Sequence, residues 1–375
     1  MIVKVLIAPN ALKGSLSASE AAMVMAHSLP KDWDAILCPI ADGGDGTLEC
    51  LVEATGGEYF SATVTGPLSS RKVNARWGRL GTSNTAVIEM AEASGLRLLS
   101  RNEYSAANTT TLGVGELMLK ALDAGFRDIL IGLGGSATND GGAGCAQALG
   151  VRLVDSHGID LQPGGMQLRQ LHTIDASGLD KRVSISNFTG LADVDNPFLG
   201  PNGATRVFGI QKGANNEEIR MLEEALSHYA DTLHQQLHRE VAEIPSSGAA
   251  GGLGAGLIAF CGAKIVSGID YVLDLVRFDE LLRDCDMVLT AEGSIDEQSL
   301  LGKGIVGIAQ RAKTLNKPVH AFAGRIIGDS EDLCAQLNLD SIHQITPPFV
   351  DEKEAFSRVR ELLSLKVDEF LATLK

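Results

Sequence analysis

The sequence predicts an α/β protein in which a parallel-sheet domain is interrupted by a second, mixed-sheet α/β domain. Short apolar runs recur at both ends of the chain, and each is followed by a Gly/Asp/Asn loop and then a helical pattern. This order favours parallel strands connected by helices. The middle of the chain alternates apolar and polar residues, which favours antiparallel or mixed strands. A chain of 375 residues is long enough for two or three domains.

The N-terminal segment supplies two strands and two helices. Residues 3–8 and 35–40 are predicted strands, because each is a short apolar run that leads into a polar loop. A helix is expected to start after Ser17, which has Glu20 at capping-box spacing. A second helix is expected over residues 46–54.

The middle segment begins with alternating runs at residues 60–67, 73–80 and 85–93. A buried strand is predicted at residues 128–131, where D-I-L-I leads directly into a cluster of glycines. Helices are predicted on either side of this strand, at residues 113–124 and 216–241. The middle segment therefore has the elements of a complete α/β domain.

The C-terminal segment returns to the pattern of the first. Its apolar runs lie at residues 287–293, 318–324 and 341–346, and a closing helix is expected over 352–374. We therefore assign residues 1–65 and 286–375 to the interrupted domain and residues 66–285 to the inserted one. Because ligand sites in such sheets lie beyond the carboxyl ends of the strands, the polar loops there are the first candidates for chemistry.

The composition excludes several classes of function. There are 32 Lys and Arg against 47 Asp and Glu, and the net charge of -15 opposes binding to a nucleic-acid backbone. The six cysteines are scattered without a C-x-x-C pair, which indicates reduced, buried thiols. The N-terminal apolar run is too short for a signal peptide, and the uncharged stretch 245–263 is too rich in Gly and Ala for a membrane helix. We expect a cytoplasmic protein.

Two polar loops follow the first two strands. A-P-N-A-L-K-G-S places Lys13 and Ser15 near a helix start, where an anion is favoured. P-I-A-D-G-G-D-G-T places Asp42 and Asp45 in a glycine-rich turn. Each loop alone is equally typical of an ordinary turn or helix cap. Their occurrence after neighbouring strands favours a shared binding site.

The most glycine-rich loop is G-L-G-G-S-A-T-N-D-G-G-A-G, after the strand D-I-L-I. Glycines let backbone N–H groups approach phosphate oxygens closely. The loop also fits a dinucleotide fingerprint through Gly132, Gly134 and Ala137, with Asp155 downstream. Against that alternative, Asp140 lies where the phosphate-facing helix should begin. A carboxylate beside phosphates needs a cation, and Mg²⁺ supplies one, which favours a nucleoside triphosphate.

Two further loops carry acidic residues. A-D-V-D-N-P contains Asp193 and Asp195, which point to opposite sides of an extended segment. L-T-A-E-G-S-I-D-E-Q-S-L-L-G-K-G contains Glu292 and Asp296, but it lacks the glycine pattern of a Walker A loop. The run S-S-G-A-A-G-G-L-G-A-G is compatible with a tight packing site or an anion-binding loop.

Taken in order, these motifs resemble the bacterial glycerate kinase family of the first type. The resemblance runs from A-P-N-A-L-K-G-S through F-G-I-Q-K-G-A and G-A-A-G-G-L-G to A-E-G-S-I-D-E-Q-S-L-L-G-K, which is nearly the whole chain. It implies an ATP- and Mg²⁺-dependent kinase that phosphorylates D-glycerate, with 2-phosphoglycerate favoured over 3-phosphoglycerate, in glycerate catabolism. It also implies a flavodoxin-like domain interrupted by a second α/β domain, with the active site in the cleft between them.

Roles for individual residues follow as hypotheses from the chemistry of phosphoryl transfer, which needs charge neutralisation, positioning and a proton acceptor. We assign catalysis to Asp193 as the base and Lys13 as an anion clamp. Substrate binding is assigned to Ser15, Asp42, Asp45, Asn196, Gln211 and Lys212. Nucleotide binding is assigned to Gly134, Gly135, Ser136, Thr138, Asn139 and Lys303. Magnesium binding is assigned to Asp140, Glu292 and Asp296.

The alternative enzyme class is a nicotinamide-dependent oxidoreductase of a small hydroxy acid, based on the dinucleotide fingerprint. The expected partners are the small molecules D-glycerate and ATP, with no nucleic acid and no membrane. A homodimer is compatible with the sequence, because an apolar helix face serves equally in a core or an interface.

Overall fold

The computed structural model describes residues 2–12, 14–296, 299 and 304–374. The chain divides into two compact units. Unit 1 comprises Met1–Ala54 and Ser267–Lys375, and unit 2 comprises Thr55–Val266. Each unit contains its own sheet.

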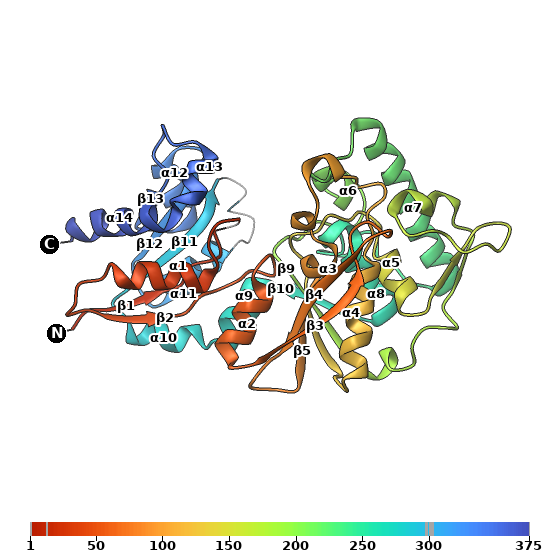
Figure 1. Cartoon of the computed structure of the whole chain (residues 1–375), viewed down its shortest axis with the longest axis horizontal. Coiled ribbons are helices and arrows are strands. Elements are labelled where there is room, and N and C mark those ends of the chain that lie inside the picture. The colour runs from red at the N-terminus through yellow and green to blue at the C-terminus, as the bar shows by residue number, and fades with distance from the viewer. Residues whose placement is uncertain (1, 13, 297–298, 300–303, 375) are drawn as a thin grey trace. The chain divides into compact units, whose positions relative to one another are not determined.

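Unit 1 is built on a five-stranded parallel sheet in the order β13-β12-β11-β1-β2. The red strands of the N-terminal segment and the blue strands of the C-terminal segment therefore form one sheet (Figure 1). Numbered within this unit alone, the order is 2-1-3-4-5, which is the flavodoxin-like order. The prediction of a parallel-sheet domain interrupted after its second strand is confirmed. The strands are β1 (Lys4–Ile7), β2 (Asp34–Leu37), β11 (Met287–Ile295), β12 (Val319–Ile326) and β13 (Ser341–Gln344).

Helices cover this sheet in two groups. The first and last helices, α1 and α14, pack on each other through residues such as Met25, Leu363 and Phe370. Helices α9, α10 and α11 form the other group. The predicted capping box is confirmed, since Glu20 N–H donates to Ser17 Oγ and Ser17 N–H donates to the Glu20 carboxylate. The helices are α1 (Ala18–His27), α2 (Thr47–Thr55), α9 (Gly268–Leu275), α10 (Phe278–Asp284), α11 (Gly304–Thr314), α12 (Ser330–Leu337), α13 (Glu352–Ser357) and α14 (Val359–Ala372).

Unit 2 is built on a six-stranded sheet in the order β10-β9-β6-β5-β4-β3. Strands β3, β4 and β5 pair antiparallel, whereas β5, β6 and β9 pair parallel, so the predicted mixed sheet is confirmed. A separate antiparallel pair joins β7 (Arg152–Val154) and β8 (Thr173–Asp175). The strands of the main sheet are β3 (Glu58–Thr65), β4 (Lys72–Arg79), β5 (Thr85–Glu89), β6 (Asp128–Gly132), β9 (Asn187–Ala192) and β10 (Lys264–Ser267).

The helices of unit 2 range from single turns to one of 22 residues. The α-helices are α3 (Met90–Ser94), α4 (Leu112–Asp123), α5 (Ala143–Ala148), α6 (Ala204–Phe208), α7 (Asn216–Leu237) and α8 (Ala249–Cys261). The short 3-10 turns are η1 (Leu96–Leu98), η2 (Arg101–Glu103), η3 (Gly165–Gln170), η4 (Val183–Ile185) and η5 (Ile210–Lys212).

The unit boundaries differ from those expected from the sequence. Strand β3 pairs with β4 along its full length, so it belongs to unit 2 rather than to the domain expected to end at residue 65. Helices α9 and α10 contact α11 and so belong to unit 1, although the inserted domain was expected to reach residue 285. In both cases, contacts between elements distant in the sequence decide to which unit an element belongs, and the local sequence pattern does not show these contacts.

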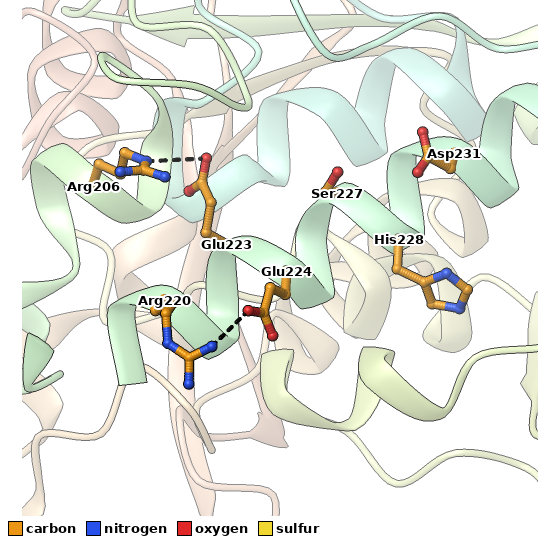
Figure 2. Close-up of a pocket in the computed structure, with 7 residues that line it drawn as sticks. All are labelled: Arg206, Arg220, Glu223, Glu224, Ser227, His228 and Asp231. Carbon is orange, nitrogen blue, oxygen red and sulfur yellow. Dashed lines mark hydrogen bonds and ion pairs between the residues drawn. The ribbon is translucent and has the colours of Figure 1, made fainter. Parts of the chain in front are cut away.

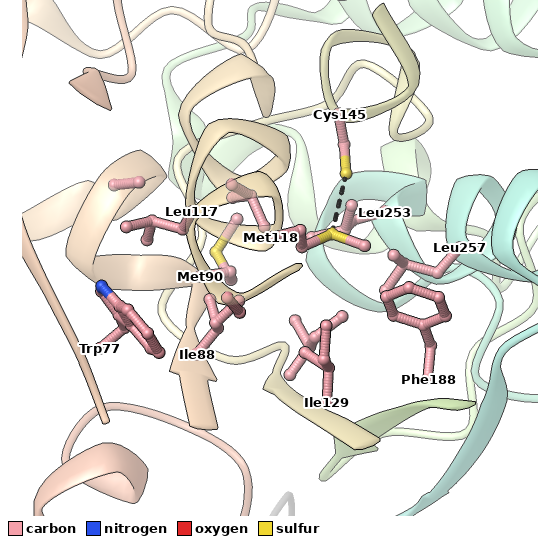
Figure 3. Close-up of a cluster of buried hydrophobic side chains, with 14 of the residues drawn as sticks. Trp77, Ile88, Met90, Leu117, Met118, Ile129, Cys145, Phe188, Leu253 and Leu257 are labelled. Carbon is pink, nitrogen blue, oxygen red and sulfur yellow. Dashed lines mark hydrogen bonds between the residues drawn. The ribbon is translucent and has the colours of Figure 1, made fainter. Parts of the chain in front are cut away.

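One hydrophobic core of unit 2 lies between its sheet and helices α4 and α8 (Figure 3), and a second is formed around α7. Ile88, Ile129 and Phe188 contribute from the strands, and Met118 and Leu253 from the helices. All six cysteines are free thiols, as predicted. Four of them are buried, whereas Cys261 and Cys334 are partly exposed. Among the described residues, no helix is long and apolar enough to cross a membrane.

Candidate active site

Unit 1 contains a buried cluster of two carboxylates and one amide. Asn10 follows β1, Asp42 follows β2, and Glu292 lies in β11. Because β1 lies between the other two strands, the three side chains meet at the carboxyl end of β1. Asn10 Nδ2 is 3.0 Å from Asp42 Oδ2 and 3.2 Å from Glu292 Oε2. We call these three residues the acid–amide cluster.

The glycine-rich turn after β2 shapes this cluster. Gly44 N–H donates to Asp42 Oδ1 at 3.1 Å. Gly43 and Gly46 have φ of 101° and 93°, a conformation that favours glycine. Asp45, on the same turn, is partly exposed. The turn therefore buries Asp42 and leaves Asp45 nearer to solvent.

Of the other predicted site residues of unit 1, two form hydrogen bonds within their own turns and two lie outside the residues that the structure describes. The Ser15 hydroxyl donates to the Leu12 carbonyl at 2.8 Å, within its own turn. Asp296 accepts from Ser299 N–H at 3.1 Å and begins another turn. Lys13 and Lys303 lie outside the described residues.

Unit 2 contributes the glycine-rich loop that follows β6. Strand β6 lies between the parallel strands β5 and β9, so the loop leaves the same edge as the ends of those strands. Gly135 has φ of 72°, which favours glycine. Gly134, Gly135 and Ser136 are partly exposed, whereas Thr138, Asn139 and Asp140 are fully buried. Within this loop, the first part is therefore accessible to a ligand, through its backbone and the Ser136 side chain.

The second part of the loop packs on α8. Thr138 Oγ1 donates to the Ala250 carbonyl at 3.2 Å, and Asn139 Nδ2 donates to Thr205 Oγ1 at 3.0 Å. A Cβ at Gly251 would collide with the carbonyl oxygen of Thr138. The Gly/Ala run is therefore a tight packing site, and the side-chain contacts to nucleotide assigned to Thr138 and Asn139 are replaced by internal ones.

Asp140 also has a structural position. Its carboxylate accepts from the backbone N–H groups of Thr111, Gly142 and Gly144 and from the hydroxyls of Thr110 and Thr111. Burial raises the pKa of Asp140, and these hydrogen bonds partly oppose that effect. Because five donor groups from the protein occupy the two oxygens, we withdraw Asp140 as a magnesium ligand. The described residues contain no group of three or more His, Cys, Asp or Glu placed to hold a metal ion.

Lys212, in η5, lies beneath the exposed part of the loop. Its side chain is buried, and Nζ is 2.8 Å from both Ser136 Oγ and the Thr138 carbonyl oxygen. Burial lowers the pKa of Lys212 to about 7, and the charge of Asp140 acts in the opposite direction. Lys212 was expected to contact substrate, but the structure places it behind Ser136.

Three predicted residues lie near the end of β9 or on η5. Asp193 follows β9 directly and is partly exposed. Leu191 of β9 pairs with Gly132 of β6, so Asp193 leaves the sheet beside the glycine-rich loop. Asn196 Nδ2 donates to the Asn202 carbonyl at 2.8 Å, which holds its own loop. Gln211 is exposed.

Sequence reasoning missed two groups of polar residues. Asn10 stands in the A-P-N-A-L-K-G-S motif without an assigned role, and its position between two carboxylates depends on strand order. Glu89 ends β5 in register with Gly132 and is buried, and its carboxylate is 3.4 Å from Arg97. Arg97 also contacts Glu92 at 2.8 Å. Glu89 could have been noticed in the sequence, because it is an acidic residue at the end of an apolar strand and directly before a helix.

The dinucleotide interpretation is wrong. A dinucleotide fold would continue from β6 through α5 into a parallel strand of the same sheet. Strand β7 instead forms a separate two-stranded antiparallel sheet with β8, outside the main sheet. Asp155 accepts from the N–H groups of His157 and Ile159 within its own turn.

An open pocket of about 480 Å³ lies elsewhere in unit 2, along α6 and α7 (Figure 2). Its lining residues include two ion pairs, between Arg206 and Glu223 and between Arg220 and Glu224. No residue predicted for the active site lines this pocket.

The comparisons with known proteins agree with the fold. The Glycerate kinase family matches residues 5–375. Glycerate 2-kinase from Escherichia coli K12 is 45% identical over 94% of this chain and 93% of its own. Glycerate kinase from Bacillus subtilis 168 is 44% identical over 99% of this chain and 98% of its own. A crystal structure from Salmonella typhimurium LT2, assigned as glycerate kinase 2, superposes with a TM-score of 0.83 at 43% identity and covers 100% of this chain and 98% of its own.

These findings define an α/β enzyme of the phosphotransferase class, with an alcohol group as acceptor. The chain belongs to the glycerate kinase family.

Proposed function

We propose that the protein transfers the terminal phosphoryl group of ATP to D-glycerate in an Mg²⁺-dependent reaction, with 2-phosphoglycerate as the product, in glycerate catabolism. The observation that carries this proposal is the glycine-rich loop at the edge of three parallel strands, with Lys212 buried behind it. Family membership and the similarity to a named glycerate 2-kinase support the acceptor and the position.

The phosphate groups of ATP are assigned to the exposed part of the loop. Gly134 and Gly135 have no side chain to keep a ligand from the backbone, and Ser136 adds a hydroxyl. Lys212 adds positive charge behind that hydroxyl at 2.8 Å. Lys13 and Lys303 keep their predicted anion-binding roles as part of this proposal.

The proton acceptor is assigned to Asp193. It is the partly exposed carboxylate that follows β9, next to the loop. A carboxylate at this position can orient the glycerate hydroxyl and take its proton as the phosphorus–oxygen bond forms. Asp195, two residues later, is exposed.

The acid–amide cluster fits an Mg²⁺ site. Mg²⁺ prefers oxygen ligands and commonly takes one or two carboxylates together with substrate phosphates. Asp42 and Glu292 offer two buried carboxylates, held by hydrogen bonds to a single amide nitrogen of Asn10. When bound, Mg²⁺ would neutralise negative charge on the phosphate oxygens. Asp45 and Asp296 remain assigned to substrate and metal binding, respectively.

The test is phosphorus NMR of the protein with ATP, Mg²⁺ and D-glycerate, beside a control without glycerate. We expect a glycerate-dependent phosphomonoester signal split into a doublet by the single proton on carbon 2. A triplet would identify carbon 3 as the acceptor. No new signal with intact ATP would contradict the proposed activity.

A further inference from the structure

A buried lysine contacts a partly exposed serine in the glycine-rich loop. Lys212 is 3% exposed, and its two hydrogen-bond partners, Ser136 Oγ and the Thr138 carbonyl, are both uncharged. Within the described part of the chain, Lys212 has no carboxylate at ion-pair distance. An isolated charge is unfavourable in such a position, so the surroundings do not by themselves hold the lysine in its protonated form.

The protonation state of Lys212 decides which way the Ser136 hydroxyl acts. A protonated lysine has only donors, so Ser136 Oγ must accept from it and direct its own proton elsewhere. A neutral lysine has a lone pair that accepts the Ser136 proton, while one N–H donates to the Thr138 carbonyl. The 2.8 Å separations satisfy both arrangements. Ser136 is therefore an outward donor in the first state and an outward acceptor in the second.

Few other charges influence this pair. Asp140 is the side chain whose charge acts on Lys212, and it favours the protonated form. On α6, Arg206 is 3.5 Å from Glu223 and is engaged there. On α7, burial raises the pKa of Tyr229 well above its usual value, so its hydroxyl stays neutral. Burial lowers the pKa of Lys212 to about 7, which agrees with the absence of a carboxylate at ion-pair distance in the described part of the chain.

We infer that Lys212 takes up a proton when an anionic oxygen ligand binds at Gly134–Ser136, and that this turns the Ser136 hydroxyl outward as a donor to the ligand. The proton comes from solvent and binds to Nζ, and no other bond changes. Lys212 is thus a positioning residue that acts through Ser136. The inference rests on the proposed function, which places the phosphates of a nucleotide at this loop.

The experiment is calorimetric titration with Mg²⁺ and ATP, without glycerate, at pH 8.5, where the nucleotide itself is fully ionised. Comparing buffers of different ionisation enthalpy gives the number of protons taken up per nucleotide. We expect about 0.5–1 proton for the native chain and close to none for Lys212→Met. The matched control is Lys181→Met, at an exposed lysine of the same unit, and it should retain the native uptake.

Two further measurements remain informative if Lys212→Met does not fold. Ser136→Ala, at a partly exposed position, should bind nucleotide at least tenfold more weakly, and Ser136→Thr should recover most of that loss because it restores the hydroxyl. The native chain alone should bind nucleotide more weakly as the pH rises from 7.5 to 9, by up to about tenfold per unit, because binding takes up a proton.

Equal proton uptake in the native chain and Lys212→Met would overturn the inference and leave the kinase proposal intact. A pH-independent affinity of the native chain would do the same. Failure of the native chain to bind nucleotide at all would instead overturn the proposed function and the inference together.

Discussion

The acid–amide cluster of unit 1 and the glycine-rich loop of unit 2 are built from opposite chemistry. The cluster gathers carboxylate oxygens from neighbouring strands and joins them with a single amide. The loop offers backbone groups, one hydroxyl and a buried lysine. The first suits a cation and the second an anion. The proposed reaction between a metal-bound nucleotide and an acid needs both kinds of surface, and each unit builds one of them on its own parallel strands.

The largest expected effect tests the cation role of the cluster. Glu292→Gln should lower kcat/KM by about 10³-fold, because it removes a carboxylate from the proposed metal site. The same variant should need more Mg²⁺ for half-maximal rate, measured by titrating Mg²⁺ at saturating ATP. The control is Glu369→Gln, at an exposed position on α14. An unchanged Mg²⁺ requirement in Glu292→Gln would assign the cluster to structure alone.

The packing behind the loop is tested by a matched pair of glycines. Gly251 and Gly262 have similar φ values, 65° and 60°, but a Cβ meets backbone only at Gly251. We expect Gly251→Ala to lower the free energy of unfolding by about 3 kcal/mol or more and Gly262→Ala by about 1 kcal/mol. Urea unfolding of both variants measures this difference. Equal losses would show that the loop and α8 can separate at little cost.

The carboxylate beside the loop carries the next effect. Asp193→Asn should lower kcat by about 10²-fold while the affinity for ATP stays within a few-fold of native, because the amide cannot accept the hydroxyl proton. Steady-state kinetics and nucleotide titration separate the two quantities. Asp195→Asn is the matched control and should retain the native rate. Loss of ATP binding in Asp193→Asn would make this residue part of the nucleotide site.

The smallest effect concerns stability away from both sites. His343 lies beside His320 and Phe322 in unit 1, and the Ser341 hydroxyl is 2.7 Å from His343 Nε2. Burial, together with His320 and Lys366, lowers the pKa of His343 to about 4. As the pH falls, His343 is protonated at a higher pH in the unfolded chain than in the folded one. The free energy of unfolding should therefore fall as the pH drops from about 6.5 to about 4.

Thermal unfolding across this pH range measures the effect. His343→Phe should reduce the pH dependence, because it removes the group that the folded state keeps neutral. An identical dependence in both proteins would move the cause of acid destabilisation to other groups.

The sequence was sufficient for the strands of unit 1 and for β3 to β6, because each is a short apolar or alternating run. It did not predict β7, β8, β9 and β10, which lack a clear run of this kind. The sequence was also insufficient for the domain boundary near β3, because the pairing of β3 with β4 is what assigns this strand to unit 2. Among the candidate site residues, Asp42 and Glu292 could be proposed from the sequence because each is an acid at the end of an apolar run, and their roles stay predictions. Asp140 was misread because a carboxylate among glycines resembles a metal ligand until its five donor groups are seen.

Burial explains most of the remaining differences. Lys212 stands in Q-K-G-A, a polar stretch that predicts an exposed lysine, yet its side chain is 3% exposed. Asn10 lies between two carboxylates only because β1 separates β2 from β11. Neither feature has a local signature, since both depend on residues distant in the sequence.

The central position of β1 has a consequence for synthesis of the chain on the ribosome. Lys4 N–H donates to Asp286, which is 282 positions later, and β1 pairs with β11 beyond it. At about 5–20 residues per second, β1 waits on the order of tens of seconds for that partner. Throughout this interval β1 has β2 as its strand partner and α1 on its apolar residues, but not β11, while the whole of unit 2 emerges and can fold. The N-terminal segment with β1 and β2 is therefore the part of the nascent protein that we expect to be most exposed to aggregation with other chains.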